Sequence, residues 1–295
     1  MSDSHTGRGD LHIVDVFARE QYTGNQLAVV ESGGDLTGEE MQTIAAEMDY
    51  SETTFVESRE PPYRVRIFTP AAEVPFAGHP TLGTAHVIRE HVAEGRPEEV
   101  VLDLNVGEVP VEVRERDGTE TLWMTQQPPA FGERLSADRL ATVLSLPVEA
   151  IDDWPVQVVS TGLPTIIVPV CDRDALSAIE IDRAAYDDVT SDTGADLVLA
   201  VCRDPREDGN DLAVRVFAPA LGVPEDPATG SANGCLAAYL ARHAYLGSGS
   251  VDARVEQGHE VGRPSLLYLQ AVDRGDDVRV EVGGRVIPVA RGELL

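Results

Sequence analysis

The chain has 295 residues, which suits one large domain or two ordinary ones, and no apolar run approaches the roughly 18 residues that span a bilayer. Its 51 acidic and 23 basic residues give a net charge of −28, a balance that would repel nucleic acid and anionic membranes. The acidic residues are spread along the chain, so we expect adaptation to a salt-rich cytosol rather than disorder or a preference for cationic partners. The amino terminus lacks the basic and apolar regions of a secretory signal, which favours a cytoplasmic location.

Every basic residue among the 23 is arginine, because the sequence contains no lysine. A pyridoxal-phosphate enzyme or a Schiff-base aldolase needs a lysine amine, so the sequence excludes both, and the missing P-loop lysine argues against a Walker-type nucleotide hydrolase. The three widely spaced cysteines, Cys171, Cys202 and Cys235, predict reduced thiols rather than a disulfide framework. The seven histidines show no metal-binding spacing, and we expect no metal site.

Strand and helix patterns alternate in the first half of the chain. Thr37 and Glu40 form a capping box, which predicts a helix over 36–50. A second helix is predicted over 81–93, where it overlaps the stretch VPFAGHPTLGTA at 74–85. Runs rich in β-branched and aromatic residues predict strands at 12–17, within 22–31, and at 51–58, 63–70, 98–115 and 120–126.

The second half follows a proline-containing boundary at 126–144, where Ser136 is placed to cap a short helix. A second motif stretch, VPEDPATGSA at 223–232, leads into a predicted helix over 231–246. The remaining patterns predict strands in 156–170, 196–204 and 212–219, a helix or turn near 172–179, and strands and turns in the tail at 264–290.

The two halves repeat each other. VRIFTPAAEVP at 65–75 aligns without a gap on VRVFAPALGVP at 214–224, and with a two-residue deletion HPTLGTA at 79–85 then lies on DPATGSA at 226–232. The interval between the two copies, from 65–75 to 214–224, is too long for a solenoid repeat. We therefore expect an α+β fold of two pseudo-symmetric lobes, 1–126 and 127–295, each a curved mixed sheet or barrel around a central helix. The last strand is free to cross back to the first lobe, and a substrate cleft is expected between the lobes.

Each motif stretch places a polar residue directly before a proline, as His79-Pro80 and as Asp226-Pro227. A polar N-cap followed by proline at the first helical position is a common helix start. The pattern therefore predicts that His79 and Asp226 cap the two central helices. Because the repeat keeps the loop but changes its titratable residue, we expect an asymmetric active site on a symmetric scaffold.

Small residues surround both predicted helix starts, among them Gly78 and Gly230. They would let a ligand approach the backbone, where the free N–H groups of a helix start attract an anion, most simply a carboxylate. Two such helix ends facing each other would clamp a small anionic substrate. These residues also have purely structural explanations. The glycines would form turns, His79 and Asp226 would cap helices, and Ser231 would be a small residue at a helix start.

Glu52 stands in the predicted strand SETTFV, on the same side as Thr54 and Val56. A carboxylate inside so apolar a strand is costly unless it is paired or protonated, and such a group suits general acid/base catalysis. The alternative is an edge strand that leaves Glu52 in water.

Six stretches carry a family resemblance: DVFA…YTGNQLAVV, SETTFV, VRIFTPAAEVPFAGHPTLGTA, VSTGLPTIIVPV, VRVFAPALGVPEDPATGSANG and QGHEVGRPS. Together, in this order over residues 11–290, they resemble the PhzF-like phenazine-biosynthesis isomerase family. The resemblance implies a diaminopimelate-epimerase-like fold, a homodimer, and a cofactor-independent isomerase acting on a small carboxylate-bearing substrate.

The resemblance also implies site residues. The family's acid/base glutamate corresponds to Glu52, and the assisting residues correspond to His79, Asp226 and Ser231. Substrate binding would fall to Asn25, Gly78, Thr229 and Gly230. Gln26 stands where the family usually has proline, so the first loop departs from the family pattern there.

Two other functions stay open at this stage. Thiol-based racemases of the same fold carry a cysteine at the start of each central helix, but the nearest cysteine here, Cys235, lies one helical turn past Ser231 and is expected in the core. Racemisation by two thiols is therefore not expected. The alternatives to the isomerase are an epimerase or racemase of this fold and a non-catalytic metabolite-binding protein.

Overall fold

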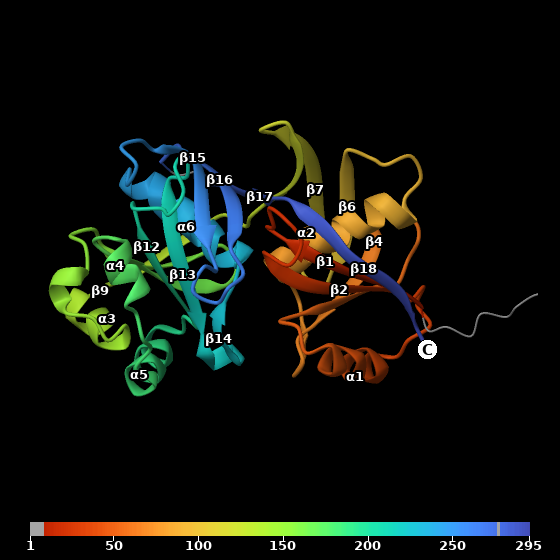
Figure 1. The fold of residues 1–295 in the computed structure, drawn as a ribbon, viewed down its shortest axis with the longest axis horizontal. Coiled ribbons are helices and arrows are strands. Elements are labelled where there is room, and N and C mark those ends of the chain that lie inside the picture. Colours follow the sequence, from red (N-terminus) through yellow and green to blue (C-terminus); the bar gives the residue numbers. More distant parts are fainter. Residues whose placement is uncertain (1–8, 276–277) are drawn as a thin grey trace, which may run out of the picture. The chain divides into compact units, whose positions relative to one another are not determined.

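The computed structural model describes residues 9–275 and 278–295 of the chain (Figure 1). The chain divides into two compact units. The first consists of residues up to Met124 together with Gly284–Leu295, and the second is Thr125–Gly283. No helix in the described part of the chain is long and apolar enough to cross a membrane.

The strands of the first unit lie in the order β18-β1-β2-β3-β4-β6-β7-β8, and the short strand β5 pairs with β4. Neighbours are antiparallel, except that β2 with β3 and β4 with β6 are parallel. The bounds are β1 Gly9–Val16, β2 Asn25–Glu31, α1 Gly38–Met48, β3 Thr53–Val56, β4 Tyr63–Phe68, β5 Glu73–Val74, α2 Gly78–Val87, a π-helical turn Ile88–Val92, β6 Glu99–Leu104, β7 Gly107–Arg116, β8 Thr119–Thr125 and β18 Val286–Leu294.

The second unit has the strand order β9-β10-β11-β12-β13-β15-β16-β17, and β14 pairs with β13. Here β11 with β12 and β13 with β15 are parallel. The bounds are β9 Ala130–Leu135, α3 Ala137–Val143, a 3-10 turn Val148–Ala150, β10 Val156–Ser160, β11 Pro164–Pro169, α4 Arg173–Ser177, α5 Arg183–Thr193, β12 Leu197–Cys202, β13 Leu212–Ala218, a 3-10 turn Pro219–Leu221, β14 Val223–Asp226, α6 Gly230–His243, β15 Ser250–Gln257, β16 Ser265–Asp273 and β17 Val278–Gly284.

The two strand orders match position by position, and the parallel pairs fall at the same places in both. α2 and α6 also take equivalent positions, each following the short strand and packing against several strands of its own unit. The predicted α+β fold of two pseudo-symmetric units, each with a central helix, is confirmed.

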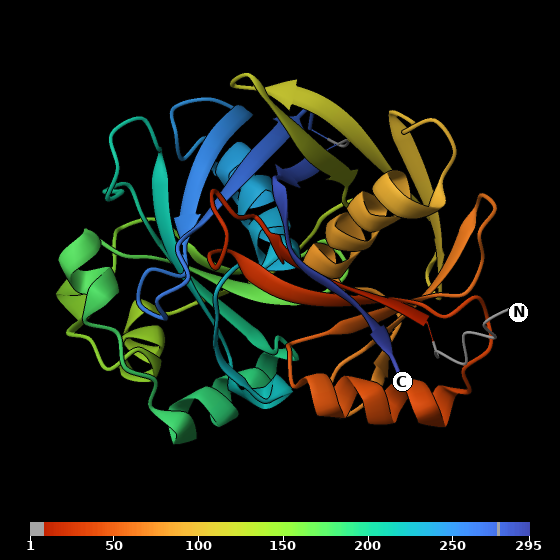
Figure 2. The same cartoon turned by 45° about the vertical axis from the view of Figure 1, so that its right-hand side comes forward.

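α2 packs closely on β1 and β2 at Gly83. A Cβ at this position would lie 2.5 Å from Leu27 Cδ2 and 2.8 Å from Val16 Cγ2, so any larger residue would push the helix off the sheet. Figure 2 shows α2, the golden-orange helix, against the strands of the first unit; the redder orange helix is α1. This contact fixes the helix on its sheet and thereby places the first turn of α2.

Several local expectations differ from the structure. The helix α5 was not predicted, because only Tyr186, Val189 and Thr190 of it are buried and the apolar stripe is therefore narrow. The strand β9 lies in the segment taken as a boundary, where it is an edge strand paired only with β10 among the described strands. Ser136 occupies the N-cap of α3, but its side chain makes no capping hydrogen bond.

An arginine–glutamate pair recurs in both units. On β4, Arg66 donates two hydrogen bonds to Glu73, at 2.8 and 2.7 Å. On β13, Arg215 donates two to Glu225, at 3.0 and 2.7 Å, and its third nitrogen donates to the carbonyls of Leu176 in α4 and of Ile179 just after it. Because Glu225 directly precedes Asp226, this pair holds the second motif loop on the sheet.

The two pairs differ in burial, and this difference gives a testable outcome. The side chains of Arg215 and Glu225 are 9% and 12% exposed, against 22% and 29% for Arg66 and Glu73. Removing one partner of a buried pair leaves an uncompensated charge and costs about 3–5 kcal/mol, whereas an exposed pair contributes about 0–1 kcal/mol. We expect Arg215→Met to lower the free energy of unfolding by more than Arg66→Met does. Urea unfolding of both variants in one buffer measures this, and equal losses would contradict the argument.

Candidate active site

The structure brings two of the predicted catalytic residues together within the first unit. Glu52 directly precedes β3, and His79 is the second residue of α2. Their side chains are 18% and 5% exposed, and His79 Nε2 lies 3.5 Å from Glu52 Oε2. Two residues along β3, Thr54 Oγ1 is 2.7 Å from Thr84 Oγ1 of α2. Glu52 and Thr54 therefore both contact α2, and they lie on one side of the chain as the alternation predicted.

His79 is a neutral imidazole. Burial lowers its pKa to about 3, opposed by a hydrogen bond with the backbone of Gln26. Since that hydrogen bond favours the charged form, the ring donates it to the Gln26 carbonyl. Nε2 has no hydrogen-bond partner within the described residues, so Nδ1 is the donor and Nε2 carries the lone pair. That lone pair is the atom 3.5 Å from the Glu52 carboxyl.

The predicted binding residues of the first unit lie around this pair. Asn25 is buried at the start of β2, next to Gln26. Gly78 opens α2 after Ala77, an N-cap whose side chain cannot accept a hydrogen bond from the helix. Because the Gln26 contact uses only the main chain, a glutamine serves there as well as the family's usual proline.

The motif of the second unit has a different local structure from the one predicted. Asp226 ends β14, the N-cap of α6 is Thr229, and α6 begins at Gly230. His79 likewise lies inside α2 rather than capping it. The prediction that His79 and Asp226 are equivalent N-caps is therefore wrong. The helix starts instead pair Gly78 with Gly230 and His79 with Ser231.

The physical reason lies in the two prolines. Pro80 falls at the third helical position, where its missing N–H costs nothing because the first four N–H groups of a helix have no intrahelical partner. Pro227 instead follows the extended residue Asp226, which β14 pairs with Val216 of β13. The same dipeptide pattern thus belongs to a helix in one unit and to the end of a strand in the other.

Asp226 belongs to a buried polar network in the second unit. Thr229 donates its hydroxyl to Asp226 Oδ2. Gln257 Nε2 donates to the Asp226 carbonyl at 2.7 Å and to Thr229 Oγ1 at 3.0 Å. Asn233 Nδ2 donates to Gln257 Oε1 at 2.9 Å. Gln257 and Asn233 were not among the predicted site residues, although both lie in the stretches that carried the family resemblance.

Cys235 lies in the core, as expected. It is fully buried one turn into α6, its sulfur donates to the Leu163 carbonyl at 3.5 Å, and burial raises the pKa of its thiol. A buried thiol with a raised pKa is a poor base, which argues against a role in proton transfer.

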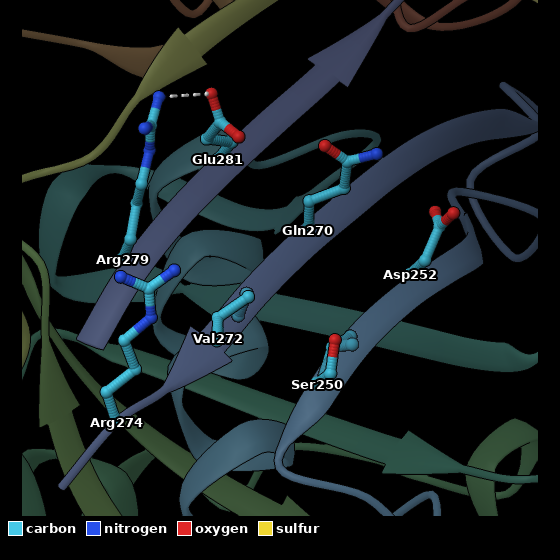
Figure 3. A pocket seen from close by; sticks show the side chains of 9 residues that line it. Ser250, Asp252, Gln270, Val272, Arg274, Arg279 and Glu281 are labelled. Atoms are coloured by element: carbon cyan, nitrogen blue, oxygen red, sulfur yellow. Dashed lines mark hydrogen bonds and ion pairs between the residues drawn. The ribbon is translucent and has the colours of Figure 1, made fainter. Parts of the chain in front are cut away.

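The described residues also contain a pocket away from these motifs, on the outer face of β15, β16 and β17 (Figure 3). Charged and polar side chains line it, and Arg279 donates to Glu281 at 3.2 Å. None of the predicted site residues lines this pocket. Within residues 9–275 and 278–295, no three histidine, cysteine, aspartate or glutamate side chains are grouped as a metal site.

Comparison with known proteins links this geometry to a family. The sequence matches the model of phenazine biosynthesis-like proteins, PhzC-PhzF, over residues 14–292. It is 38% identical over 283 residues to the trans-2,3-dihydro-3-hydroxyanthranilate isomerase of Pseudomonas aeruginosa, covering 95% of this chain and 97% of that protein. The fold is similar to that of a Bacillus anthracis phenazine biosynthesis protein of the PhzF family, with a TM-score of 0.89 and 26% identity over 97% of this chain and 99% of the other. A hydroxyproline epimerase from Agrobacterium vitis shares the fold at a TM-score of 0.61 and 14% identity, over 97% of this chain and 92% of the other.

Two histidines with lowered pKa values, His79 and His86, predict a loss of stability in acid. The folded-state pKa is about 3 for His79 and about 4 for His86, both below the ordinary value of 6.5. Below pH 6.5 the unfolded chain therefore binds protons that the folded chain does not, and stability falls as pH falls, by about 1.4 kcal/mol per pH unit for each histidine. His79→Gln and His86→Gln should each flatten this slope between pH 6.5 and pH 4.

Urea unfolding across this range, in molar salt that screens the acidic surface, measures the slope. Above pH 7 the slopes of variant and parent should agree. If His79→Gln unfolds with the parent's slope between pH 6.5 and pH 4, the neutral state assigned to His79 is wrong.

Proposed function

Because the chain belongs to the PhzC-PhzF family of phenazine biosynthesis-like proteins and is an isomerase, we propose that Glu52 moves a proton within a small carboxylate-bearing substrate by general acid/base catalysis. The observation that carries the proposal is the contact of Glu52 Oε2 with His79 Nε2 at 3.5 Å, between two largely buried side chains. Once it holds the transferred proton, the carboxyl can donate a hydrogen bond to the lone pair of the neutral imidazole, so the protonated state of Glu52 has a defined partner.

The proton follows a closed path in this mechanism. The Glu52 carboxylate takes a proton from an acidic C–H of the substrate, and the electron pair of that bond enters the substrate's conjugated system. The resulting carboxylic acid donates a hydrogen bond to the lone pair of His79 Nε2, and this bond holds the Glu52 carboxyl in its orientation. Glu52 then returns the proton to another carbon of the conjugated system, so the double bond shifts and no co-reactant is consumed.

The residues of the second unit have supporting roles in this proposal. Asp226 and Ser231 act on the same substrate, as hydrogen-bond partners or in proton transfer. The substrate carboxylate binds N–H groups at an uncapped helix start, for which Gly78 and Gly230 are the candidates, because the helix dipole there favours an anion. Asn25 and Thr229, at the edges of these starts, contribute polar contacts. The support for these roles is the family pattern together with the helix starts.

The relatives direct the choice of substrate. Trans-2,3-dihydro-3-hydroxyanthranilate appears in the name of the Pseudomonas aeruginosa relative and carries a carboxylate. We take it as the first compound to test, followed by other small unsaturated carboxylates. The proposal also includes a cytoplasmic location, a homodimer and a reaction that needs no cofactor.

An epimerase is the second candidate, favoured by the shared fold of the hydroxyproline epimerase. Epimerisation by two bases needs a proton-transferring side chain on each face of one carbon. The helix starts here carry His79 and Ser231, and a serine hydroxyl is a weak base at neutral pH. The isomerase is therefore the better-supported proposal.

Replacing Glu52 by Gln tests the assigned base. The amide keeps the size of the side chain but cannot accept the substrate proton, so turnover should fall by about 10²–10⁴-fold or more. The far-UV circular dichroism and the affinity for the substrate should stay close to those of the parent. Glu47→Gln, on the exposed face of α1, is the matched control and should keep full turnover. An E52Q variant with parental turnover would end the assignment.

Reaction in D2O separates isomerisation from epimerisation. An isomerase moves the double bond and places deuterium at the carbon that receives the proton, whereas an epimerase places it at the original stereocentre. We expect label at the new position and a shifted double bond, read by proton NMR. Label confined to the stereocentre, with the double bond unmoved, would make the enzyme an epimerase.

A further inference from the structure

We propose that Gln257 is a positioning residue of the isomerase, whose buried side-chain amide directs the hydroxyl proton of Thr229 onto the carboxylate of Asp226. The inference rests on the role that the proposed function gives to Asp226. Gln257 is the last residue of β15, and it is 1% exposed.

The orientation of the amide is fixed by its partners. Its Nε2 donates to the Asp226 carbonyl and to Thr229 Oγ1, at 2.7 and 3.0 Å. Its Oε1 accepts from the backbone N–H of Thr229 at 3.2 Å and from Asn233 Nδ2 at 2.9 Å. A carbonyl cannot donate and an N–H cannot accept, so the flipped amide would lose these bonds.

This orientation determines where the Thr229 proton lies. Thr229 Oγ1 faces the Nε2 amide group of Gln257, which can only donate, so Oγ1 accepts this hydrogen bond. The single hydroxyl proton of Thr229 is therefore free for Asp226 Oδ2, and the hydroxyl does donate there. Thr229 is the N-cap of α6 but makes no side-chain capping bond, which forgoes about 1 kcal/mol of helix stability.

The first unit shows that the fold does not need a glutamine here. β4 pairs with β6 in the same register as β13 pairs with β15. The equivalent pairs are Arg64 with Asp103 and Ala213 with Glu256. One residue further on, Leu104 therefore takes the place of Gln257, and it is 2% exposed. A buried leucine fills this position in the first unit, so packing alone does not require a glutamine. The buried amide of the second unit is explained by the hydrogen bonds that it makes.

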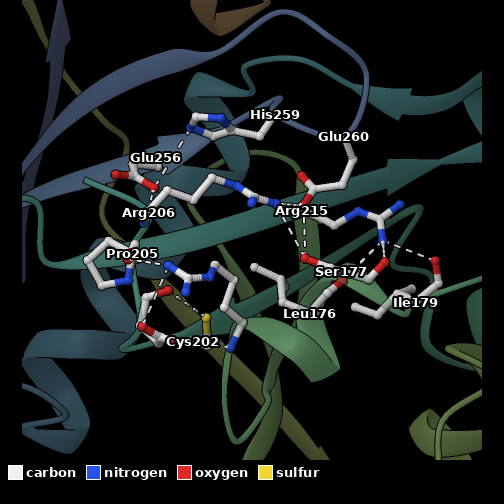
Figure 4. Close-up of polar contacts among 12 residues, drawn as sticks. Leu176, Ser177, Ile179, Cys202, Pro205, Arg206, Arg215, Glu256, His259 and Glu260 are labelled. Carbon is white, nitrogen blue, oxygen red and sulfur yellow. Dashed lines mark hydrogen bonds and ion pairs between the residues drawn. The ribbon is translucent and has the colours of Figure 1, made fainter.

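The residues on either side hold Gln257 in place. The buried carboxylate of Glu256 accepts from the N–H groups of Arg206 and Glu207, at 2.7 and 2.8 Å. Figure 4 shows Glu256 at the end of its strand with Arg206 and His259 beside it. Gly258 has φ +80°, and a Cβ there would lie 2.5 Å from the Pro227 carbonyl oxygen. The chain thus passes directly against the loop that Gln257 orients, and only glycine permits this approach.

Gln257→Leu tests the proposal, because it installs the residue that the first unit carries at this position. We expect a folded protein whose kcat falls by about a hundredfold, as for a small misplacement of a reacting group, while KM changes little. The pH profile of kcat should also change, because the Thr229 hydroxyl is no longer held on the Asp226 carboxylate. Thr229→Val should have the same effects, Thr229→Ser should restore most of the activity, and Gln257→Leu with Thr229→Val should be no worse than either alone.

Two reference variants separate the possible failures. Gln157→Leu removes another buried amide of the second unit, one that contacts Gly132 and His243, and should leave kcat and its pH profile unchanged. If Asp226→Asn lowers turnover but Gln257→Leu behaves like Gln157→Leu, the positioning role is wrong and the proposed function stands. If Asp226→Asn keeps full turnover, both the role of Asp226 and this inference fail. Should Gln257→Leu not fold, Thr229→Val against Thr229→Ser decides, and equal kcat values and pH profiles for those two would overturn the inference.

Discussion

The close packing of α2 on β1 and β2 is the constraint on which the site in the first unit depends. Gly83 has no Cβ, so the helix can lie against Leu27 and Val16 at a distance that any other residue would forbid. This packing sets the first turn of α2 beside the start of β3, where His79 reaches Glu52. The same burial that makes the packing tight keeps the imidazole neutral, and the proposed proton transfer uses that neutrality.

The two units share the interactions that stabilise each of them, but they differ in the residues that we assign to binding and catalysis. The paired Arg66–Glu73 and Arg215–Glu225 recur with similar geometry, although the two glutamates lie at different distances along the chain from their arginines. By contrast, the helix starts carry a histidine in one unit and a serine in the other. The buried position that holds Leu104 in the first unit holds Gln257 in the second. Local packing constrains a backbone position strongly, but it tolerates a polar side chain wherever that side chain finds all its hydrogen bonds.

Individual elements show how much of the structure could be predicted from the sequence. The capping box of Thr37 and Glu40 forms as predicted, because it depends only on residues three apart. Cys235 is in the core, because its helix is apolar on nearly every side. α5 escaped prediction because its narrow apolar stripe resembles a surface loop. The pairing of His79 with Asp226 was wrong because the alignment counted residues, whereas the helix start depends on where each strand ends.

The sequence by itself determined the duplication, the fold class, the family and the identity of Glu52 and His79 as candidates, since each of these follows from local patterns and motifs. Only the tertiary structure decided that Glu52 and His79 touch, which nitrogen of the imidazole carries the proton, and that Ser231 rather than Asp226 matches His79. It also decided that a glutamine from β15 orients the loop of Asp226. These facts depend on contacts between residues far apart in the chain, and such contacts are fixed by the packing of helices on sheets and not by any local pattern.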